Sequence, residues 1–215
     1  MHNSGMIVEP DAYILSVEQA VARLLSGGVV ALPTDTVYGI AVDYRCARAV
    51  ERLFAIKGRD AAKPIPLLIS DLEKLAALAT GVDHRALALV ERLWPGALTV
   101  IVGASDSVPD AIRRGQSTVG VRMPDCAITL QIIAEVGGVL AVTSANRSGE
   151  SEARSAEEVR QSLGNLVDGV IDGGRSPQSQ PSSVVDLSGD SVLILREGTI
   201  PATRIHAILR EVDDG

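Results

Sequence analysis

The 215-residue sequence has few aromatic side chains: one Trp, three Tyr and one Phe make up 2% of the chain. Immunoglobulin-like sandwiches and base-stacking RNA-binding sheets both rely on aromatic residues, so this scarcity counts against both. The core must instead be built from Val, Leu, Ile and Ala, in a composition that is 46% hydrophobic and 22% charged. Such a composition favours an α/β protein with one well-filled core.

Cysteines and long apolar runs are also scarce. Cys46 and Cys126 have neither the spacing of a metal site nor a disulfide-rich context, which is typical of a reduced cytosol. No apolar run reaches the roughly 18–20 residues that a membrane span needs, and residues 1–13 lack the apolar core of a signal peptide. We therefore expect a cytoplasmic protein with no membrane contact.

Several catalytic motifs are missing. The sequence contains no G-x-x-x-x-G-K-[ST] and no G-x-G-x-x-G, which counts against standard P-loop and dinucleotide-binding folds. No G-x-S-x-G surrounds Ser144, so a serine hydrolase is disfavoured. His2, His84 and His206 are isolated, and no H-E-x-x-H or carboxylate cluster predicts a metal cage. What remains is a set of hydroxyls and cations suited to holding a polyanion and a small zwitterion.

Hydrophobic periodicity predicts helices that alternate with strands. Ser16 to Gln19 fits a capping box, and Gly27 and Gly58 fit helix ends. Helices and strands intermingle with no long linker, which predicts one α/β domain with a mixed sheet. The predicted helices are 17–26, 47–58, 71–80, 83–94, 128–135, 156–163 and 201–212. The predicted strands are 29–33, 66–69, 98–102, 118–123, 139–143, 169–172, 183–187 and 192–195.

Polar clusters stand at the ends of predicted strands, where ligands bind in open α/β sheets. The net charge of −7 argues against a whole-surface nucleic-acid binder, so an anionic ligand needs a local basic cluster. The clusters are Thr34–Tyr38, Lys57–Lys63, Arg122 and Thr143–Asn146, with Ser182, Ser183 and Arg196 at similar positions.

Each cluster also has a purely structural interpretation. Thr and Ser at strand ends usually cap turns, and Lys57, Arg59 and Lys63 fit a solvated helix end that complements the helix dipole. Arg122 and Arg196 end apolar strands, so each should be partly buried and needs an anion. Asp or Glu can supply that anion, so the residues alone leave an internal ion pair and a ligand equally open.

Taken in order, seven segments resemble those of the L-threonylcarbamoyladenylate synthases, a family with the YrdC-like fold. They cover about residues 17–212, and seven in sequence are specific although each alone would be weak. The resemblance implies a single YrdC-like domain over 1–215, in the short form without an extra C-terminal domain. The segments are "PTDTVYGI" (33–40), "KGRDAAKP" (57–64), "WPGALTVI" (94–101), "VGVRMPD" (119–125), "TSANRSG" (143–149), "SSVVD" (182–186) and "LREG" (195–198).

The resemblance implies an α/β (α+β) fold, in which a twisted mixed sheet with flanking helices surrounds a deep cationic cavity. Members of this family are nucleotidyltransferases that combine L-threonine, bicarbonate and ATP into threonylcarbamoyl-AMP and pyrophosphate. A separate transferase complex then modifies tRNAs that read ANN codons, and contact with tRNA or double-stranded RNA is also implied. Mg²⁺ would be carried on the ATP phosphates, with no metal held by the protein itself.

Residue roles follow from the same resemblance. The implied threonine-binding residues are Thr34, Thr36, Tyr38, Arg122 and Ser182. The implied ATP-binding residues are Lys57, Arg59, Lys63, Thr118, Thr143, Ser144, Asn146 and Arg196. Lys57 and Arg59 would be catalytic because they offset charge that builds as pyrophosphate leaves. Arg122 would bind the threonine carboxylate as a bidentate fork.

Two segments depart from the family pattern. Glu150 and Glu152 lie where relatives commonly have a proline-containing segment, so no binding residue is transferred to 150–155. Leu68 stands where some relatives have a polar residue, so one threonine contact is expected to be missing.

Two other functions stay open. One is an RNA-binding module of the same fold without adenylate chemistry, although the net charge and the few aromatics count against it. The other is a carbamoyl-handling domain related to the hydrogenase-maturation carbamoyltransferases. Those proteins are much longer and carry zinc-binding and acylphosphatase-like segments, which this sequence does not show.

Overall fold

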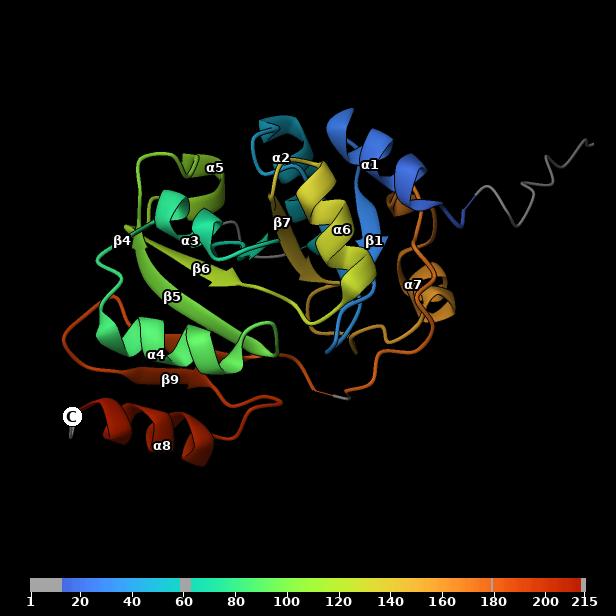
Figure 1. The fold of residues 1–215 in the computed structure, drawn as a ribbon. Coiled ribbons are helices and arrows are strands. Elements are labelled where there is room, and N and C mark those ends of the chain that lie inside the picture. Colours follow the sequence, from blue (N-terminus) through green and yellow to red (C-terminus); the bar gives the residue numbers. More distant parts are fainter. Residues whose placement is uncertain (1–12, 59–62, 179, 214–215) are drawn as a thin grey trace, which may run out of the picture.

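The computed structural model describes residues 13–58, 63–178 and 180–213, which form one mixed sheet of nine strands with flanking helices (Figure 1). The strand order is β1-β2-β7-β3-β6-β5-β8-β9, and β4 pairs with β5. The β3–β6 and β5–β8 pairs are parallel and the other pairs are antiparallel. The strands are β1 (Val30–Leu32), β2 (Gly39–Val42), β3 (Leu67–Ile69), β4 (Ala79–Thr80), β5 (Leu98–Ala104), β6 (Thr118–Arg122), β7 (Val139–Ser144), β8 (Ser183–Asp186) and β9 (Leu193–Arg196).

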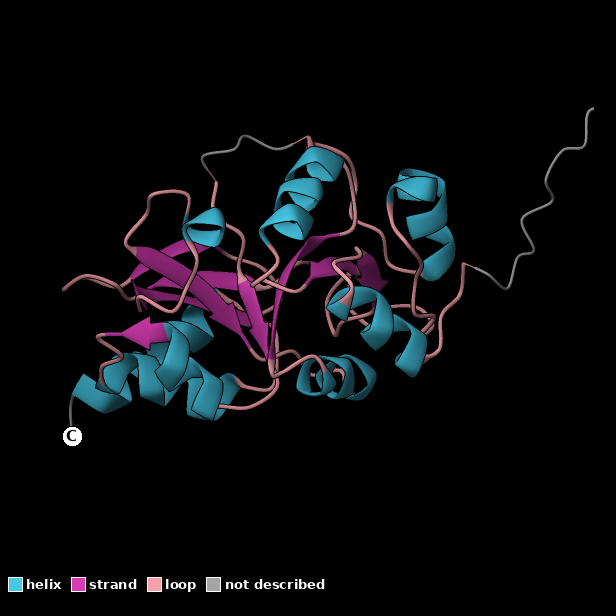
Figure 2. Cartoon of the chain, turned by 90° about the horizontal axis from the view of Figure 1, so that it is seen from above, coloured by secondary structure: helices cyan, strands magenta, loops and turns pink. Residues whose placement is uncertain are grey.

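Helices lie on either side of the strands when the molecule is viewed from above (Figure 2). No helix among the described residues is long and apolar enough to cross a membrane. The helices are α1 (Val17–Leu25), α2 (Ala47–Lys57), α3 (Glu73–Leu78), α4 (His84–Leu93), α5 (Asp110–Arg113), α6 (Ala127–Glu135), α7 (Ala156–Leu163) and α8 (Ala202–Asp213), with a 3₁₀ turn at Gly164–Leu166.

Local sequence signals explain where several helices begin and end. The Ser16 Oγ accepts from Gln19 N, and the Gln19 side chain accepts from Ser16 N, so the predicted capping box of α1 is confirmed. Asp83 caps α4 by accepting from Ala86 N at 3.0 Å. Gly58 ends α2 with φ at 56°, a left-handed conformation that glycine adopts without a Cβ penalty.

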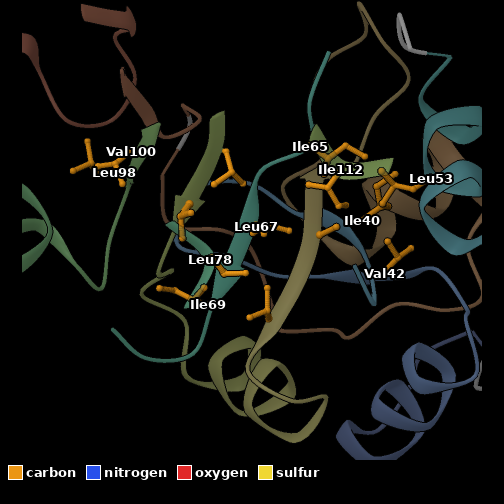
Figure 3. Packing of buried hydrophobic residues seen from close by; sticks show 14 of the residues in the cluster. Ile40, Val42, Leu53, Ile65, Leu67, Ile69, Leu78, Leu98, Val100 and Ile112 are labelled. Carbon is orange, nitrogen blue, oxygen red and sulfur yellow. The ribbon is translucent and has the colours of Figure 1, made fainter. Parts of the chain in front are cut away.

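Two apolar cores lie on opposite faces of the central strands. In β3, Leu67 and Ile69 face one core and Leu68 faces the other, as the two-residue period of a strand requires. The first core includes Leu53 of α2 and Ile112 of α5, both labelled in Figure 3. The second core, here called the α1/α6 core, joins β1, β2, β3 and β7 to α1 and α6.

Helices α4 and α8 pack beside each other near β9, at one end of the sheet (Figure 1). An ion pair between Arg92 and Glu211 links them.

The sequence prediction was wrong at some elements. The strand expected at 169–172 is absent from the described structure apart from Val170, which forms isolated bridges with Ile14 and Ala31. The helix expected at 71–80 is shorter, and its last two positions form β4 instead. Strand β2 and helix α5 were not predicted, since both are short and their apolar residues show no clear period.

Candidate active site

A cavity of about 530 Å³ lies over one face of β5, β6 and β8. Residues two apart in a strand face the same side, so β6 presents Thr118, Gly120 and Arg122 to the cavity, and β5 presents Thr99 and Ile101. The opposite face of these strands is core. This volume falls within the range of small-molecule sites.

The cavity lies on the same face of the sheet that α1 and α6 cover over β1, β2, β3 and β7. Leu68 and Val142 belong to the α1/α6 core and also line the cavity, so they mark the boundary. Among the described residues, the α1/α6 core takes members from β1, β2, β3 and β7 and none from β5, β6 or β8. The cavity therefore opens where the helical cover ends.

The Thr34–Tyr38 cluster connects β1 to β2, rather than a strand to a helix. Thr34 Oγ1 donates to Val37 O at 2.6 Å and lies 3.0 Å from Thr36 Oγ1. The Tyr38 hydroxyl donates to Gly174 O at 2.8 Å, and burial raises its pKa. Thr34 thus shapes the turn, Thr36 lies within reach of Arg122, and Tyr38 ties this turn to residues 173–174.

Arg122, at the end of β6, is only 6% exposed. Its Nη2 pairs with Asp35 Oδ1 at 2.5 Å, and its Nη1 donates to Thr36 Oγ1 at 3.0 Å. The Nε donates to Gly96 O at 2.8 Å. Burial lowers the pKa of Arg122, and the charge of Asp35 opposes that shift. The internal ion pair that the sequence left open is therefore present, with Asp35 as the anion.

Lys57, the last residue of α2, is buried, so its interpretation as a solvated helix end is wrong. Its ammonium donates to Ser144 O at 2.9 Å and to Asn146 Oδ1 at 2.6 Å. Asn146 Nδ2 in turn donates to Glu150 O at 2.7 Å. These bonds join α2 to the last residue of β7 and to the chain after it, and they hold a cation at the cavity wall.

Arg196 closes the far side of the cavity, where its Nε donates to Ser182 O at 2.9 Å and its Nη2 to Ser182 Oγ at 3.2 Å. Ser182 Oγ also bonds Thr99 Oγ1 at 2.9 Å. The sequence predicted partial burial of Arg196 at the end of an apolar strand; burial of the guanidinium does lower its pKa, but the residue as a whole is exposed. The reason is that β9 is an edge strand, on which Leu193 and Leu195 are exposed too.

The structure brings the predicted site residues together. Arg59 lies outside the described residues, and the others line this one cavity: Thr34, Thr36, Tyr38, Lys57, Lys63, Thr118, Arg122, Thr143, Ser144, Asn146, Ser182 and Arg196.

Sequence reasoning missed other wall residues. Thr99 was detectable, because it is the polar position of the apolar strand "LTVIV". Glu152 also lines the cavity, although no binding residue was expected between 150 and 155. No local signal indicates Ile101 or Gly120, which reach the wall through the register of β5 and β6.

Positive charge is concentrated at this wall in a chain whose net charge is −7. Its described residues carry four cations, Lys57, Lys63, Arg122 and Arg196, and one carboxylate, Glu152. An anionic ligand is therefore favoured here despite the acidic surface.

A family profile described as "Telomere recombination" and named for Sua5, YciO and YrdC matches residues 22–198. The chain belongs to the Sua5/YciO/YrdC family. The predicted family and the predicted fold, a twisted mixed sheet with flanking helices, are thereby confirmed.

Named relatives include the threonylcarbamoyl-AMP synthase of Bacillus subtilis, which is 35% identical over 194 residues, 90% of this chain and 56% of the relative. The enzyme of the same name from Thiobacillus denitrificans is 35% identical over 172 residues, 80% of this chain and 91% of the relative. The crystal structure of Pyrococcus abyssi Sua5 complexed with L-threonine has a TM-score of 0.87 at 35% identity, over 89% of this chain and 56% of that one. The chain thus spans little more than half of the Bacillus and Pyrococcus proteins.

Proposed function

We propose that this chain is a threonylcarbamoyl-AMP synthase, which forms threonylcarbamoyl-AMP and pyrophosphate from L-threonine, bicarbonate and ATP. The observation that carries the proposal is one cavity with four cationic side chains and a row of hydroxyls. The names of the Bacillus and Thiobacillus relatives support it, as does the L-threonine in the Pyrococcus Sua5 crystal.

In this proposal the two substrates occupy different parts of the wall. Threonine lies at Arg122, with Thr36 and Ser182 nearby, and the guanidinium takes its carboxylate. The ATP phosphates lie toward Lys57 and Lys63. Arg59, outside the described residues, is proposed to act beside them.

The reaction proceeds in two steps. The threonine amine first attacks the carbon of CO2, which bicarbonate yields by losing hydroxide; the new N–C bond gives a carbamate, and the proton released from the nitrogen combines with that hydroxide as water. A carbamate oxygen then attacks the α-phosphorus in line, the P–O bond to the β-phosphate breaks, and pyrophosphate leaves with the electron pair. Because two anions must meet, positioning and fixed positive charge supply most of the catalysis, and no covalent enzyme intermediate is needed.

ATP is proposed to bring Mg²⁺ with it, because a hard cation prefers phosphate oxygens and water. Glu152 is the one carboxylate of the described wall, and the described residues contain no group of three or more His, Cys, Asp or Glu side chains that could hold a metal ion. The protein side chains therefore fit a metal that is shared with the phosphates rather than caged.

The test is a reconstituted reaction. The protein is incubated with ATP, Mg²⁺, bicarbonate and L-threonine, and pyrophosphate and the threonylcarbamoyl adenylate are measured, the latter by mass spectrometry. Pyrophosphate release that is equal without threonine would show the substrate assignment to be wrong. Salt-sensitive RNA binding with no ATP turnover would favour the RNA-binding alternative.

Two further parts of the proposal concern the partner and the location of the enzyme. A tRNA-modifying transferase complex would consume the adenylate. The enzyme is proposed to act in the cytosol, because ATP, bicarbonate and tRNA are all present there.

A further inference from the structure

Arg122 retains hydrogen-bonding capacity after its protein contacts are made. A guanidinium has five N–H groups, and the described contacts of Arg122 use one each on Nε, Nη1 and Nη2. One N–H therefore remains on each terminal nitrogen. Two parallel N–H groups match the two oxygens of a carboxylate, but only when the guanidinium plane is held in one orientation.

Asp35 contacts Arg122 and is itself outside the described wall of the main cavity. Its Oδ1 accepts from Arg122 Nη2 at 2.5 Å and from Asp125 N at 3.1 Å. Asp35 is not among the described residues of the main cavity wall, and it lines a second hollow of about 410 Å³ together with Gly96 and Trp94. Among the described residues, Asp35 therefore lies outside the main cavity wall and is connected to it by its bond to Arg122.

Stability alone does not account for this pair. The side chains of Arg122 and Asp35 are 7% and 13% exposed, and removing two charges from water costs about as much as their attraction returns. The other anchors of the guanidinium, Thr36 Oγ1 and Gly96 O, are neutral acceptors. The charge-assisted bond to Asp35 is the strongest of the three, so it decides the orientation.

We propose that Asp35 is a positioning residue for substrate recognition: it fixes the guanidinium plane of Arg122 so that one N–H on each terminal nitrogen faces the cavity and takes the α-carboxylate of the amino-acid substrate. This inference rests on the proposed function. It predicts that Asp35 affects the KM for the amino acid and not the KM for ATP.

The test compares three substitutions in the full chain by steady-state kinetics, with circular dichroism to confirm folding. Asp35→Ala removes the anionic partner of Arg122. It should raise KM for L-threonine by about tenfold or more, because the guanidinium is no longer aligned with the carboxylate of the substrate. Asp35→Glu keeps the charge but moves the carboxylate, so it should raise that KM similarly. Asp35→Asn keeps an acceptor at the same place but loses the charge-assisted bond, so its KM for L-threonine should rise by about threefold to tenfold, less than in Asp35→Ala. KM for ATP should change less than about twofold in all three.

A carboxylate-free analogue separates recognition from general damage. L-threoninamide should bind much more weakly than L-threonine to the wild type, measured by calorimetry without ATP. In Asp35→Ala and Asp35→Glu this preference should shrink. The matched control is Asp43→Ala, which breaks a second Asp–Arg pair, with Arg45, outside the described cavity wall. It should leave both KM values unchanged.

Three results would overturn the proposal: an unchanged threonine KM in Asp35→Glu, equal rises of both KM values, or an Asp35→Asn variant as impaired as Asp35→Ala. Asp35→Asn and Asp35→Glu keep a polar partner for Arg122, so the comparison survives if the alanine variant does not fold. A wild-type protein without threonine-dependent pyrophosphate release would instead refute the proposed function, while the calorimetric comparison would still test Asp35.

Discussion

One face of the sheet has two halves that differ in what covers them. Under α1 and α6, strands β1 and β7 present apolar side chains such as Leu32 and Leu140, which are fully buried. Beyond the helices, β5 and β6 present Thr99, Thr118 and Arg122 to the cavity. Both halves obey the same two-residue alternation, so the backbone does not distinguish them. The comparison shows that the site forms where α1 and α6 no longer cover this face of the sheet and the side chains on the face become polar.

The largest expected effect concerns the covered half. Leu140→Ala should lower the free energy of unfolding by about 3 kcal/mol, since it deletes buried methyl groups and leaves a cavity. Chemical denaturation measures this loss. Thr99→Val in the uncovered half is the matched control and should cost less than about 1 kcal/mol. Equal losses of unfolding free energy in both variants would show that the two halves do not differ in packing.

The next effect belongs to the uncovered half. Lys57→Ala should lower turnover on the order of a hundredfold, because it removes a charge matched to the transition state. Arg59→Ala is expected to act alike. Pyrophosphate release under saturating substrates measures both. Arg23→Ala removes an exposed cation from the last turn of α1 and serves as the control with wild-type turnover. Wild-type turnover in Lys57→Ala would show that Lys57, in the uncovered half, has no catalytic role.

Two glycines sharpen the boundary between the halves. A Cβ on Gly39 would lie 2.5 Å from Val142 Cγ1, so Gly39→Ala should destabilise the protein by about 1–3 kcal/mol. A Cβ on Gly120 would meet Thr99 Cγ2 at an ordinary 3.4 Å. Gly120→Ala should therefore melt near the wild-type temperature while weakening substrate binding, measured as KM. A large loss of stability in Gly120→Ala would mean that this half is as tightly packed as the other.

The smallest effect is a pH dependence away from the cavity. Asp168 accepts from Val29 N at 2.7 Å and pairs with Arg52. Burial alone would raise the pKa of Asp168, but the bonds from Arg52 and Val29 outweigh it and lower the pKa. A lowered folded-state pKa stabilises the fold above the unfolded value of about 4, and this contribution is lost as the pH falls through the folded value.

Asp168→Asn tests this contribution. The variant should lose about 1 kcal/mol of stability at neutral pH and show a shallower acid transition, with turnover per folded molecule unchanged. Denaturation curves between neutral pH and pH 3 measure it. Identical acid transitions for variant and wild type would contradict the assignment.

Local chemistry made much of this structure predictable. Ser16 and Gly58 mark helix ends by mechanisms that act within a few residues, and both predictions are confirmed. What could not be predicted depends on partners far along the chain. The anion for Arg122 comes from Asp35, 87 positions away, and no spacing rule connects them. Arg196 is more exposed than its apolar strand suggests, because whether a strand lies at the centre or the edge of a sheet depends on its neighbours and not on its own residues.

The parallel pairing of β8 with β5, in which Ser183 lies opposite Leu98, has a consequence for biosynthesis. The ribosome delivers β5 long before β8, and a domain generally folds as a unit. A growing chain that ends before Ser182 carries Thr36 and Arg122 but lacks the strands that bring Ser182 and Arg196 to the opposite wall. The cavity wall is therefore complete only after the chain has been synthesised beyond Arg196.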